Sequence, residues 1–386
     1  MPNRRARRAT RHKPTKLPGF QKLPKEVVLE LMKVAPKDVH AVLLQTCKSF
    51  YSLGLSALYR SIWITSPETS YKLSCSFERN VQLASSVRSF KIMLQSNDTR
   101  IIFNWKLDLI LSLIRNVEDL QIFVGERQYL MFMSLKFSSF QFPKLRSLTL
   151  SLCEVFIESY GMTLDFLGKH PLLEHLCLFR LDLSPGLGHH FEGPEIFQPV
   201  HLPILRSFRG PISILKCLAT NLPSLSSLVL EISHDDPNHV LSQLTSLSLL
   251  ENRWIQRDDC IKPGLSVELI VSLADRRLFD LLETAIIHLP SDLEELNICC
   301  ALSEPAESVF NLDIILSAIT PKRFSAIRKF GLMFTMYTFN TNIVQKIGNI
   351  GNDCRSLETI SLCGRVYVRS SKDARDWIEQ KTQEAV

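Results

Sequence analysis

A six-residue pattern of apolar and polar positions recurs along most of the chain. Its form is apolar-x-x-apolar-x-apolar, as in LRSLTL at 145–150, LEHLCL at 173–178 and LETISL at 357–362. The alternation in its second half is typical of a β-strand that buries one face. The central apolar positions of ten such matches are 90, 120, 148, 176, 208, 228, 247, 296, 330 and 360. We therefore expect a strand at each of them, and a further degenerate unit near VELIV at 267–271, in the widest gap.

Amphipathic stretches with helical spacing lie between several of these matches. They cover residues 104–116, 162–170, 212–220 and 311–319. Prolines also stand just before several of the predicted strands, at positions 143, 171, 203, 223 and 290. A strand, a loop, a helix and a return therefore form one unit, which buries its apolar face only against its neighbours. Burial in such a core accounts for the 60 leucines among the 386 residues.

A pattern of helical period precedes these repeats, in LPKEVVLELMKVA at 23–35. Its apolar residues fall on one side of a helix, and they are Val27, Val28, Leu31 and Val34. A second apolar helix is expected after Asp38, which suits the N-cap position. Gly54 interrupts that pattern, so a short third helix is predicted at 55–60 and an alternating strand at 61–65. Three such small helices need a cover for their apolar faces.

The segment from Leu23 to Ile62 resembles an F-box. The matching positions are Leu23, Pro24, Glu26, Val27, Leu31, Asp38, the pair Cys47-Lys48 and the pair Tyr59-Arg60. Val34-Ala35 stand where the family often has a leucine, and Leu58-Tyr59 where it often has a tryptophan. The resemblance implies a three-helix unit at 17–65 that binds a Skp-type adaptor and, through it, a cullin-RING ubiquitin ligase. The implied adaptor contacts are Leu23, Pro24, Val27, Leu31, Val39, Leu43 and Cys47. The alternative is an ordinary three-helix cap on the domain that follows.

Residues 66–386 resemble the leucine-rich-repeat domains that often follow an F-box, notably in fungal proteins. The resemblance implies an α/β horseshoe with a parallel concave sheet, helices on the convex side, and a target protein on the concave face. Because alternate strand residues point away from the core, we expect target-binding side chains there. Our candidates are Ser147, Thr149, His175, Phe179, Val229, Glu231, Lys329 and Met333. The alternative is that a C-terminal helix or a loop covers these residues.

The net charge of +6 is concentrated at the N-terminus. Nine basic residues precede Glu26, which leaves the rest of the chain at −3. Residues 1–16 are therefore predicted to be a disordered basic tail, with a nuclear-localisation signal as the functional alternative. Binding to nucleic acid is disfavoured, because it needs a basic surface on the folded part.

Nothing in the sequence has the spacing of a catalytic or metal site. The phosphate-loop, dinucleotide, zinc-protease and hydrolase-elbow motifs are missing, so we expect no enzyme and no cofactor. The ten cysteines lack a repeated short spacing, which favours reduced core thiols over a disulfide framework or a metal site. The pairs His189-His190 and Asp235-Asp236 are expected to be solvated loop residues. No stretch is long and apolar enough to span a membrane, so an intracellular location, cytoplasmic or nuclear, is expected.

Two functions are consistent with these patterns. The first is a substrate receptor of a Skp–cullin–F-box ubiquitin ligase. The second is a repeat-containing scaffold or nuclear interaction protein that has no role in a ligase. The sequence identifies neither the target protein nor a required modification of it.

Overall fold

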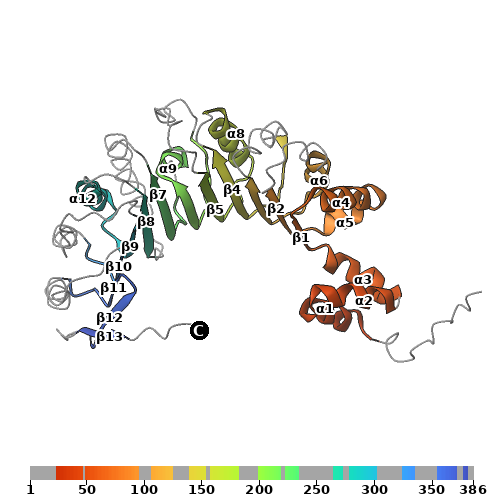
Figure 1. Cartoon of the computed structure of the whole chain (residues 1–386), viewed down its shortest axis with the longest axis horizontal. Helices are drawn as coiled ribbons and strands as arrows, with labels where there is room; N and C mark the ends of the chain where they lie inside the picture. Colours follow the sequence, from red (N-terminus) through yellow and green to blue (C-terminus); the bar gives the residue numbers. More distant parts are fainter. Residues whose placement is uncertain are drawn as a thin grey trace, which may run out of the picture.

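The computed structural model is an α/β protein built on one open, curved sheet of thirteen strands (Figure 1). The structure describes residues 23–46, 48–94, 106–124, 139–153, 157–181, 199–218, 222–233, 264–272, 278–301, 324–334, 354–371 and 377–380. The strands follow one another in chain order, β1 to β13, and each pairs with the next. All pairs from β1 to β11 are parallel, whereas β11–β12 and β12–β13 are antiparallel.

The strands are short and evenly placed along the arc. Their bounds are β1 Ser61–Ile64, β2 Ser89–Leu94, β3 Asp119–Val124, β4 Ser147–Cys153, β5 His175–Leu181, β6 Ser207–Pro211, β7 Ser227–Ser233, β8 Leu265–Ser272, β9 Leu293–Ala301, β10 Lys329–Phe334, β11 Thr359–Leu362, β12 Arg365–Arg369 and β13 Trp377–Gln380. Nine of the ten strands predicted from the repeat pattern are therefore present, together with β8 at the degenerate unit. The tenth match, 244–249, lies outside the described residues, and β7 pairs directly with β8.

The sheet forms the inner side of the arc and helices cover its outer side, except for the first three helices, which lie beyond β1 at one end (Figure 1). Their bounds are α1 Lys25–Val34, α2 Lys37–Thr46, α3 Lys48–Leu58, α4 Pro67–Arg79, α5 Val81–Ser86, α6 Leu107–Leu113, α8 Ile157–Gly168, α9 Ile212–Leu218 and α12 Leu278–His288. The helices predicted at 104–116, 162–170 and 212–220 are confirmed as α6, α8 and α9, while 311–319 lies outside the described residues.

Three described helices were missed by the sequence analysis, namely α4, α5 and α12. The first has clear start signals, because Pro67 occupies its first turn and the Ser66 hydroxyl accepts a hydrogen bond from the Thr69 N–H. The side chain of Asn80 caps α5 in the same way, by accepting from the Gln82 N–H. The sequence signals of these two helices are therefore polar caps, which a pattern of apolar repeats does not include.

The parallel strands are aligned so that equivalent residues of successive units lie side by side. Leu120 pairs with Leu148, Leu148 with Leu176, and Leu176 with Phe208. These side chains are almost completely buried, as are those two positions further along most strands, and together they form one continuous core under the helices. In-register stacking of this kind gives each unit two neighbours against which to bury its apolar face.

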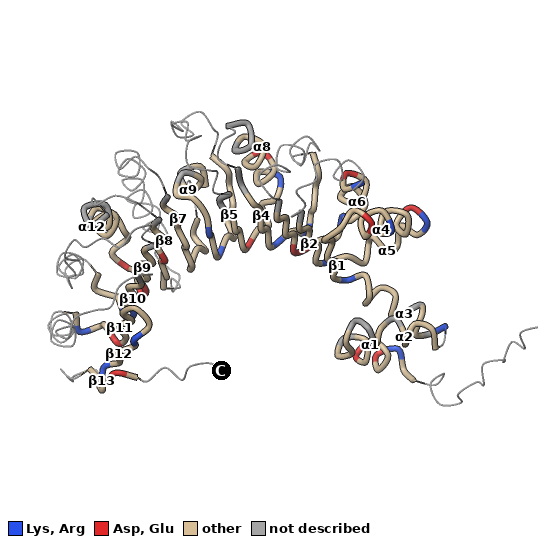
Figure 2. The backbone as a smooth tube through the Cα atoms, in the orientation of Figure 1, with Lys and Arg blue, Asp and Glu red and all other residues tan. Residues whose placement is uncertain are grey.

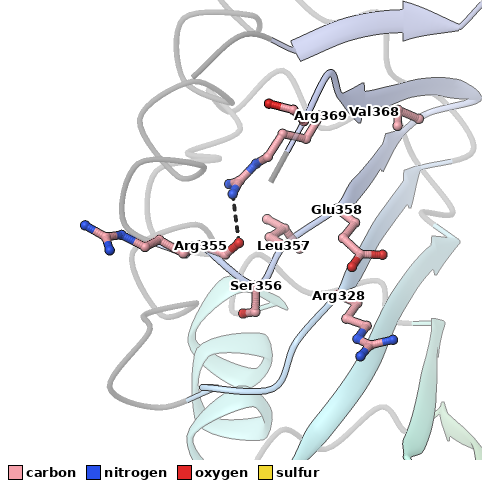
Figure 3. Close-up of a pocket in the computed structure, with 8 residues that line it drawn as sticks. Arg328, Arg355, Ser356, Leu357, Glu358, Val368 and Arg369 are labelled. Carbon is pink, nitrogen blue, oxygen red and sulfur yellow. Dashed lines mark hydrogen bonds between the residues drawn. The ribbon is translucent and has the colours of Figure 1, made fainter. Parts of the chain in front are cut away.

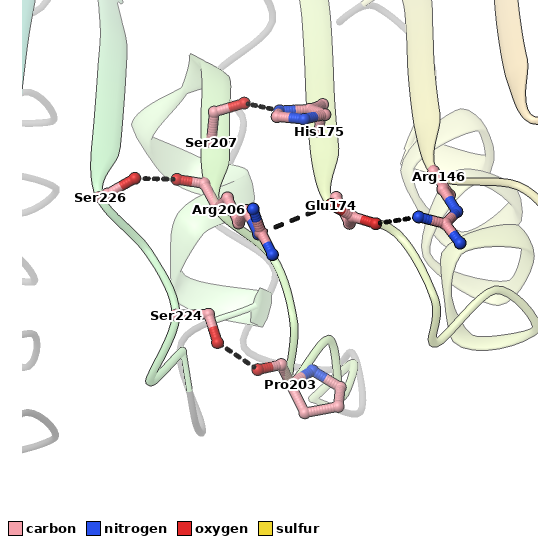
Figure 4. Close-up of polar contacts among 8 residues, drawn as sticks. All are labelled: Arg146, Glu174, His175, Pro203, Arg206, Ser207, Ser224 and Ser226. Carbon is pink, nitrogen blue, oxygen red and sulfur yellow. Dashed lines mark hydrogen bonds and ion pairs between the residues drawn. The ribbon is translucent and has the colours of Figure 1, made fainter. Parts of the chain in front are cut away.

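The residue just before each of several strands carries a charge, and these charges alternate in sign (Figure 4). The backbone N–H of Glu174 donates to the carbonyl of Arg146 at 2.7 Å, and that of Arg206 donates to the carbonyl of Glu174 at 2.7 Å. The Glu174 carboxylate lies 3.0 Å from Nη1 of Arg146 and 3.5 Å from Nε of Arg206. Backbone and side-chain contacts together align the starts of β4, β5 and β6.

The first three helices have a separate small core made of Val28, Met32, Leu44 and Phe50. The prediction that Gly54 breaks a helix was wrong, because α2 ends at Thr46 and α3 runs from Lys48 through Gly54 to Leu58. A Cβ atom at position 54 would lie 2.7 Å from Cε of Met32 and 2.9 Å from Cδ2 of Leu44. Glycine is therefore used here to let α3 pack closely against α1 and α2.

The three-helix unit is joined to the sheet through α3 and β1. Leu55 packs against both the small core and the main core, and Tyr59 packs against the main core. The strand predicted at 61–65 is present as β1, and it pairs with β2 as the first strand of the sheet.

The far end of the sheet is closed by the antiparallel strands β12 and β13. Arg369 of β12 is 9% exposed, and its guanidinium group donates to the carbonyl oxygens of Arg355 at 2.8 Å and Cys354 at 3.0 Å. The ring of Trp377 lies 5.1 Å from the same guanidinium carbon. Arg369 thus satisfies the hydrogen-bonding capacity of two backbone carbonyls in the segment that leads into β11, the last parallel strand.

Candidate functional site

A stripe of exposed apolar side chains runs along the outer side of α1. Val27, Leu31 and Val34 are 41%, 41% and 80% exposed, at a spacing of four and three residues that places them on one face. The expectation that Val28 shares this face was wrong, because Val28 is buried with Met32 in the small core on another face of the helix. Helix α1 therefore has two apolar faces, and only one of them is covered by the described part of the chain.

Helix α2 adds a second group of exposed apolar side chains. Val39 is 38% exposed and Val42 is 63% exposed. Glu26 and Glu30 of α1 are also exposed. We use the name apolar helix face for Val27, Leu31, Val34, Val39 and Val42. Exposed apolar side chains that gather on two neighbouring helices of one unit are typical of a site that binds another protein.

Most of the adaptor contacts implied by the F-box resemblance lie on or beside the apolar helix face. Val27, Leu31, Val39 and Pro24 are exposed, whereas Leu23 and Leu43 are partly buried against the small core. Cys47 lies outside the described residues. The resemblance did not point to Val34 and Val42, although their apolar spacing on the two helices was visible in the sequence.

A second candidate surface is the concave face of the sheet. The predicted target-binding residues all lie on this face, because each alternates along its strand with residues of the buried core. Ser147, Thr149, Phe179, Val229 and Glu231 are partly exposed, and His175, Lys329 and Met333 are exposed. The described C-terminal segment is a pair of strands, so the helix considered as a cover for this face is not seen there.

Aromatic and cationic side chains form a continuous row on the concave face. Nζ of Lys91 lies 5.1 Å from the ring centroid of Trp63 and 5.1 Å from that of Phe123. The rings of Phe123 and Phe179 are 5.7 Å apart, and the guanidinium carbon of Arg209 lies 5.0 Å from the Phe179 ring. We call Trp63, Lys91, Phe123, Phe179 and Arg209 the aromatic–cationic row.

Only Phe179 of this row was among the residues singled out from the sequence. The other four follow from the same alternation rule, applied to the strands of the first three units and of β6. Lys91 pairs with Trp63 across β1 and β2, while Arg209 pairs with Cys177 across β5 and β6. Ser151, which the register places between Phe123 and Phe179, is only 6% exposed and leaves room for the two rings to meet.

Carboxylates occupy the middle and the C-terminal half of the concave face. Glu231 of β7 lies 3.1 Å from Nε of Arg209, and Glu295 of β9 lies 3.9 Å from Nζ of Lys329. Glu268 of β8 accepts a weak hydrogen bond from the thiol of Cys299, at 3.6 Å. Burial and the neighbouring Glu268 carboxylate raise the pKa of Cys299 to about 11. Positive and negative residues are thus interspersed along the arc (Figure 2).

A cavity of about 520 Å³ lies at the C-terminal end of the array, between the last parallel units and β12 (Figure 3). Arg328, Glu358 and Arg369 are among its lining residues. The Arg369 guanidinium group is engaged by backbone carbonyls, and the Arg355 side chain extends away from the other lining residues (Figure 3). The contacts of Arg369 around this cavity fit a structural role in closing the last strands of the sheet.

The residue types needed for chemistry are not brought together in the described ranges. Among these residues there is no group of three histidine, cysteine or acidic side chains that could hold a metal ion. The pairs His189-His190 and Asp235-Asp236 lie outside the described residues. Cys75, Cys177, Cys299 and Cys300 form no disulfide, and burial raises the pKa of Cys177 to about 11. No described helix has the length and apolar character needed to cross a bilayer.

Comparison with known proteins gave no assignment. The chain matches no family model and none of the curated proteins. We therefore infer function from the two surfaces described above.

Proposed function

We propose that the chain is a substrate-recognition subunit of a Skp–cullin–F-box ubiquitin ligase. The three helices α1–α3 act as the F-box and bind a Skp-type adaptor through the apolar helix face. The repeats act as a leucine-rich-repeat domain and hold the target protein on the concave sheet. In this proposal the chain has no catalytic role of its own and positions the target for the ligase.

The observation that carries the proposal is the exposure of Val27, Leu31 and Val34 on a helix that already buries Val28 and Met32. Full burial of a valine or leucine side chain is worth about 1.5–3 kcal/mol. Several such side chains left in water therefore favour association with a partner that covers them. A helix that only capped the sheet would need one apolar face, and α1 has a second.

The arrangement of the two surfaces supports the same function. The apolar helix face belongs to a unit with its own core, joined to the sheet through α3 and β1. The concave face begins at β1 and continues along the arc (Figure 1). One partner can therefore bind the helices while a different partner occupies the sheet, as a receptor that links a target to a ligase requires.

The alternative function is a repeat scaffold or nuclear interaction protein without a ligase. It uses the concave face in the same way but gives no role to the apolar helix face. The two functions therefore differ in the consequence of changing α1. The basic residues 1–16, which suggest nuclear import, lie outside the described residues.

The test is the affinity of the full chain for a purified Skp-type adaptor, measured by calorimetry. Val27→Glu with Val34→Glu is expected to weaken binding at least about 10-fold, because two charges would be buried in an apolar interface. The double change Leu23→Ala with Pro24→Ala is expected to weaken it as well.

The matched control is Val81→Glu on α5, where the valine is 58% exposed but belongs to the repeats. This variant should bind the adaptor as the wild type does. Adaptor affinity unchanged by the changes in α1, or equally reduced by Val81→Glu, would contradict the assignment of the apolar helix face.

A further inference from the structure

The aromatic–cationic row spans β1 to β6, so it crosses the strands instead of following one of them. Adjacent strands are about 4.8 Å apart, and five steps cover about 24 Å, which is the length of about seven residues of extended chain. The row therefore has the size of a site for an extended peptide segment. Trp63, at the edge strand β1, is 56% exposed and forms one end of it.

Lys91 is the cation in the row with unused binding capacity. Its ammonium group lies between the rings of Trp63 and Phe123, and within the described residues no carboxylate lies within 4 Å of it. An ammonium group has three N–H donors, and ring faces do not satisfy all of them. Arg209 differs, because its guanidinium group is already paired with Glu231 at 3.1 Å. Lys91 therefore lacks an anionic partner, and no other residue of the row supplies one.

The ring faces define the second requirement for a partner. Phe123 and Phe179 are partly exposed and lie on either side of the buried Ser151. Their ring centroids are 5.7 Å apart. Exposed aromatic rings beside a fixed cation are typical anchors of protein interfaces, where aromatic residues and arginine are enriched. The site therefore fits an apolar or aromatic side chain next to an anionic one.

The charges on the rest of the face separate a protein partner from nucleic acid. Asp119 of β3 accepts a hydrogen bond from the Ser89 hydroxyl of β2, and Glu231, Glu268 and Glu295 follow towards the C-terminus. A phosphate backbone laid along the arc would meet these carboxylates, whereas binding of nucleic acid depends on a basic surface. A phosphorylated peptide is also disfavoured, because phosphate is usually recognised by a cluster of arginines. A single lysine suits a carboxylate.

From this geometry we propose that the aromatic–cationic row binds an extended, acidic segment of the target protein. A carboxylate of that segment pairs with Lys91, and a neighbouring apolar or aromatic side chain packs on Phe123 and Phe179. The inference rests on the proposed function in one respect only, namely that the concave face is the target-binding surface. It does not require the adaptor.

The experiment uses the full chain as bait for a random dodecapeptide library displayed on phage. Enriched peptides are then synthesised with a fluorescent label and their affinities measured by polarisation. We expect peptides that carry aspartate or glutamate next to an aromatic or large aliphatic residue. Their affinity should fall at least about 10-fold in Lys91→Glu and in Phe179→Ala, as is common for central interface contacts.

One control variant and one altered peptide distinguish a direct contact from a structural effect. Lys169→Glu, directly after α8 and outside the concave face, is the matched charge reversal and should bind the peptides as the wild type does. In Lys91→Glu, a peptide whose acidic residue is replaced by lysine should regain affinity, which a misfolded variant would not give. Melting temperatures of all variants are measured alongside.

Several results would overturn the inference. They are an empty selection, enrichment of basic peptides, equal affinity of wild type and Lys91→Glu, and displacement of bound peptide by oligothymidylate, which would indicate a nucleic-acid site. Adaptor binding is measured on the same samples. If the chain binds the adaptor but no peptide, only the inference about the aromatic–cationic row is contradicted. If it binds peptide but not the adaptor, only the ligase assignment is contradicted.

Discussion

The backbone N–H of Phe142 donates a hydrogen bond to Nε2 of His170, over 3.0 Å. Nδ1 of the same ring lies 2.7 Å from the carbonyl oxygen of Phe166. His170 is 2% exposed and is packed against the rings of Phe142 and Phe166. Since Nε2 accepts, Nδ1 must carry the proton that bonds Phe166, and the imidazole is neutral. One histidine thereby joins the end of α8 to the segment that leads into β4.

The first prediction concerns the pH dependence of stability. Burial is the main cause that lowers the pKa of His170 below its ordinary value of 6.5. In the unfolded chain the ring takes up a proton as the pH falls through 6.5, whereas the folded protein resists it, so stability is lost as the pH falls below that value. Chemical denaturation should show that the stability difference between wild type and His170→Gln narrows below this pH. A difference that is constant with pH would contradict it.

The second prediction concerns the close approach of helices at Gly54. A valine there would meet Met32 and Leu44, and overpacking of this kind typically costs about 1–3 kcal/mol. Gly54→Val should therefore loosen the three-helix unit, as seen by faster hydrogen exchange in α1–α3, while the sheet keeps its protection. Ser56→Val, at an exposed position of the same helix, is the control. Equal exchange in both variants would show that α3 does not need a glycine.

The third prediction concerns the cysteines. Burial raises the pKa of Cys177 to about 11 and that of Cys300 to about 12, from an ordinary value of 9.0. Only the thiolate reacts with iodoacetamide, so at neutral pH alkylation of Cys177 should be about 100-fold slower than in the urea-unfolded chain. Mass spectrometry of alkylated peptides gives the rate for each residue. Native and unfolded rates that agree would place the Cys177 thiol in water.

The fourth prediction concerns the C-terminal cap. Arg369→Met removes the donors to the carbonyls of Arg355 and Cys354, and an unsatisfied buried carbonyl costs about 1–3 kcal/mol. The free energy of unfolding, measured by urea titration, should fall by about 1–3 kcal/mol. Arg365→Met is the control on the same strand. The Arg365 side chain is 68% exposed, and its ion pair with Glu379 is long, at 3.9 Å. Loss of stability in both variants alike would remove the special role of Arg369.

The strands could be predicted from the sequence because the alternation of apolar and polar residues is local. Leu148 and Leu150 give the buried face of β4 without any knowledge of its neighbours, and the same holds for most units. The helix break at Gly54 was misjudged because local propensity argues against glycine in a helix, whereas the close contact with Met32 and Leu44 decides in its favour.

The aromatic–cationic row could not be found by reading one strand at a time. Lys91 contacts Phe123, which lies one repeat further along the chain, and Trp63, which lies one repeat earlier. The pairing register of β1, β2 and β3 is needed to bring them together. Similarly, the F-box resemblance indicated Val27 and Leu31, but only the fold distinguishes their exposed face from the buried face of Val28 and Met32.

The proposed role as a ligase receptor is tested most directly by size-exclusion chromatography of the full chain mixed with a purified Skp-type adaptor. We expect the two proteins to elute together as a complex of one copy each, and Val27→Glu with Val34→Glu to separate them while the variant stays folded. Separate elution of the wild-type chain and the adaptor, at concentrations well above those expected for a stable complex, would contradict the assignment as a ligase receptor.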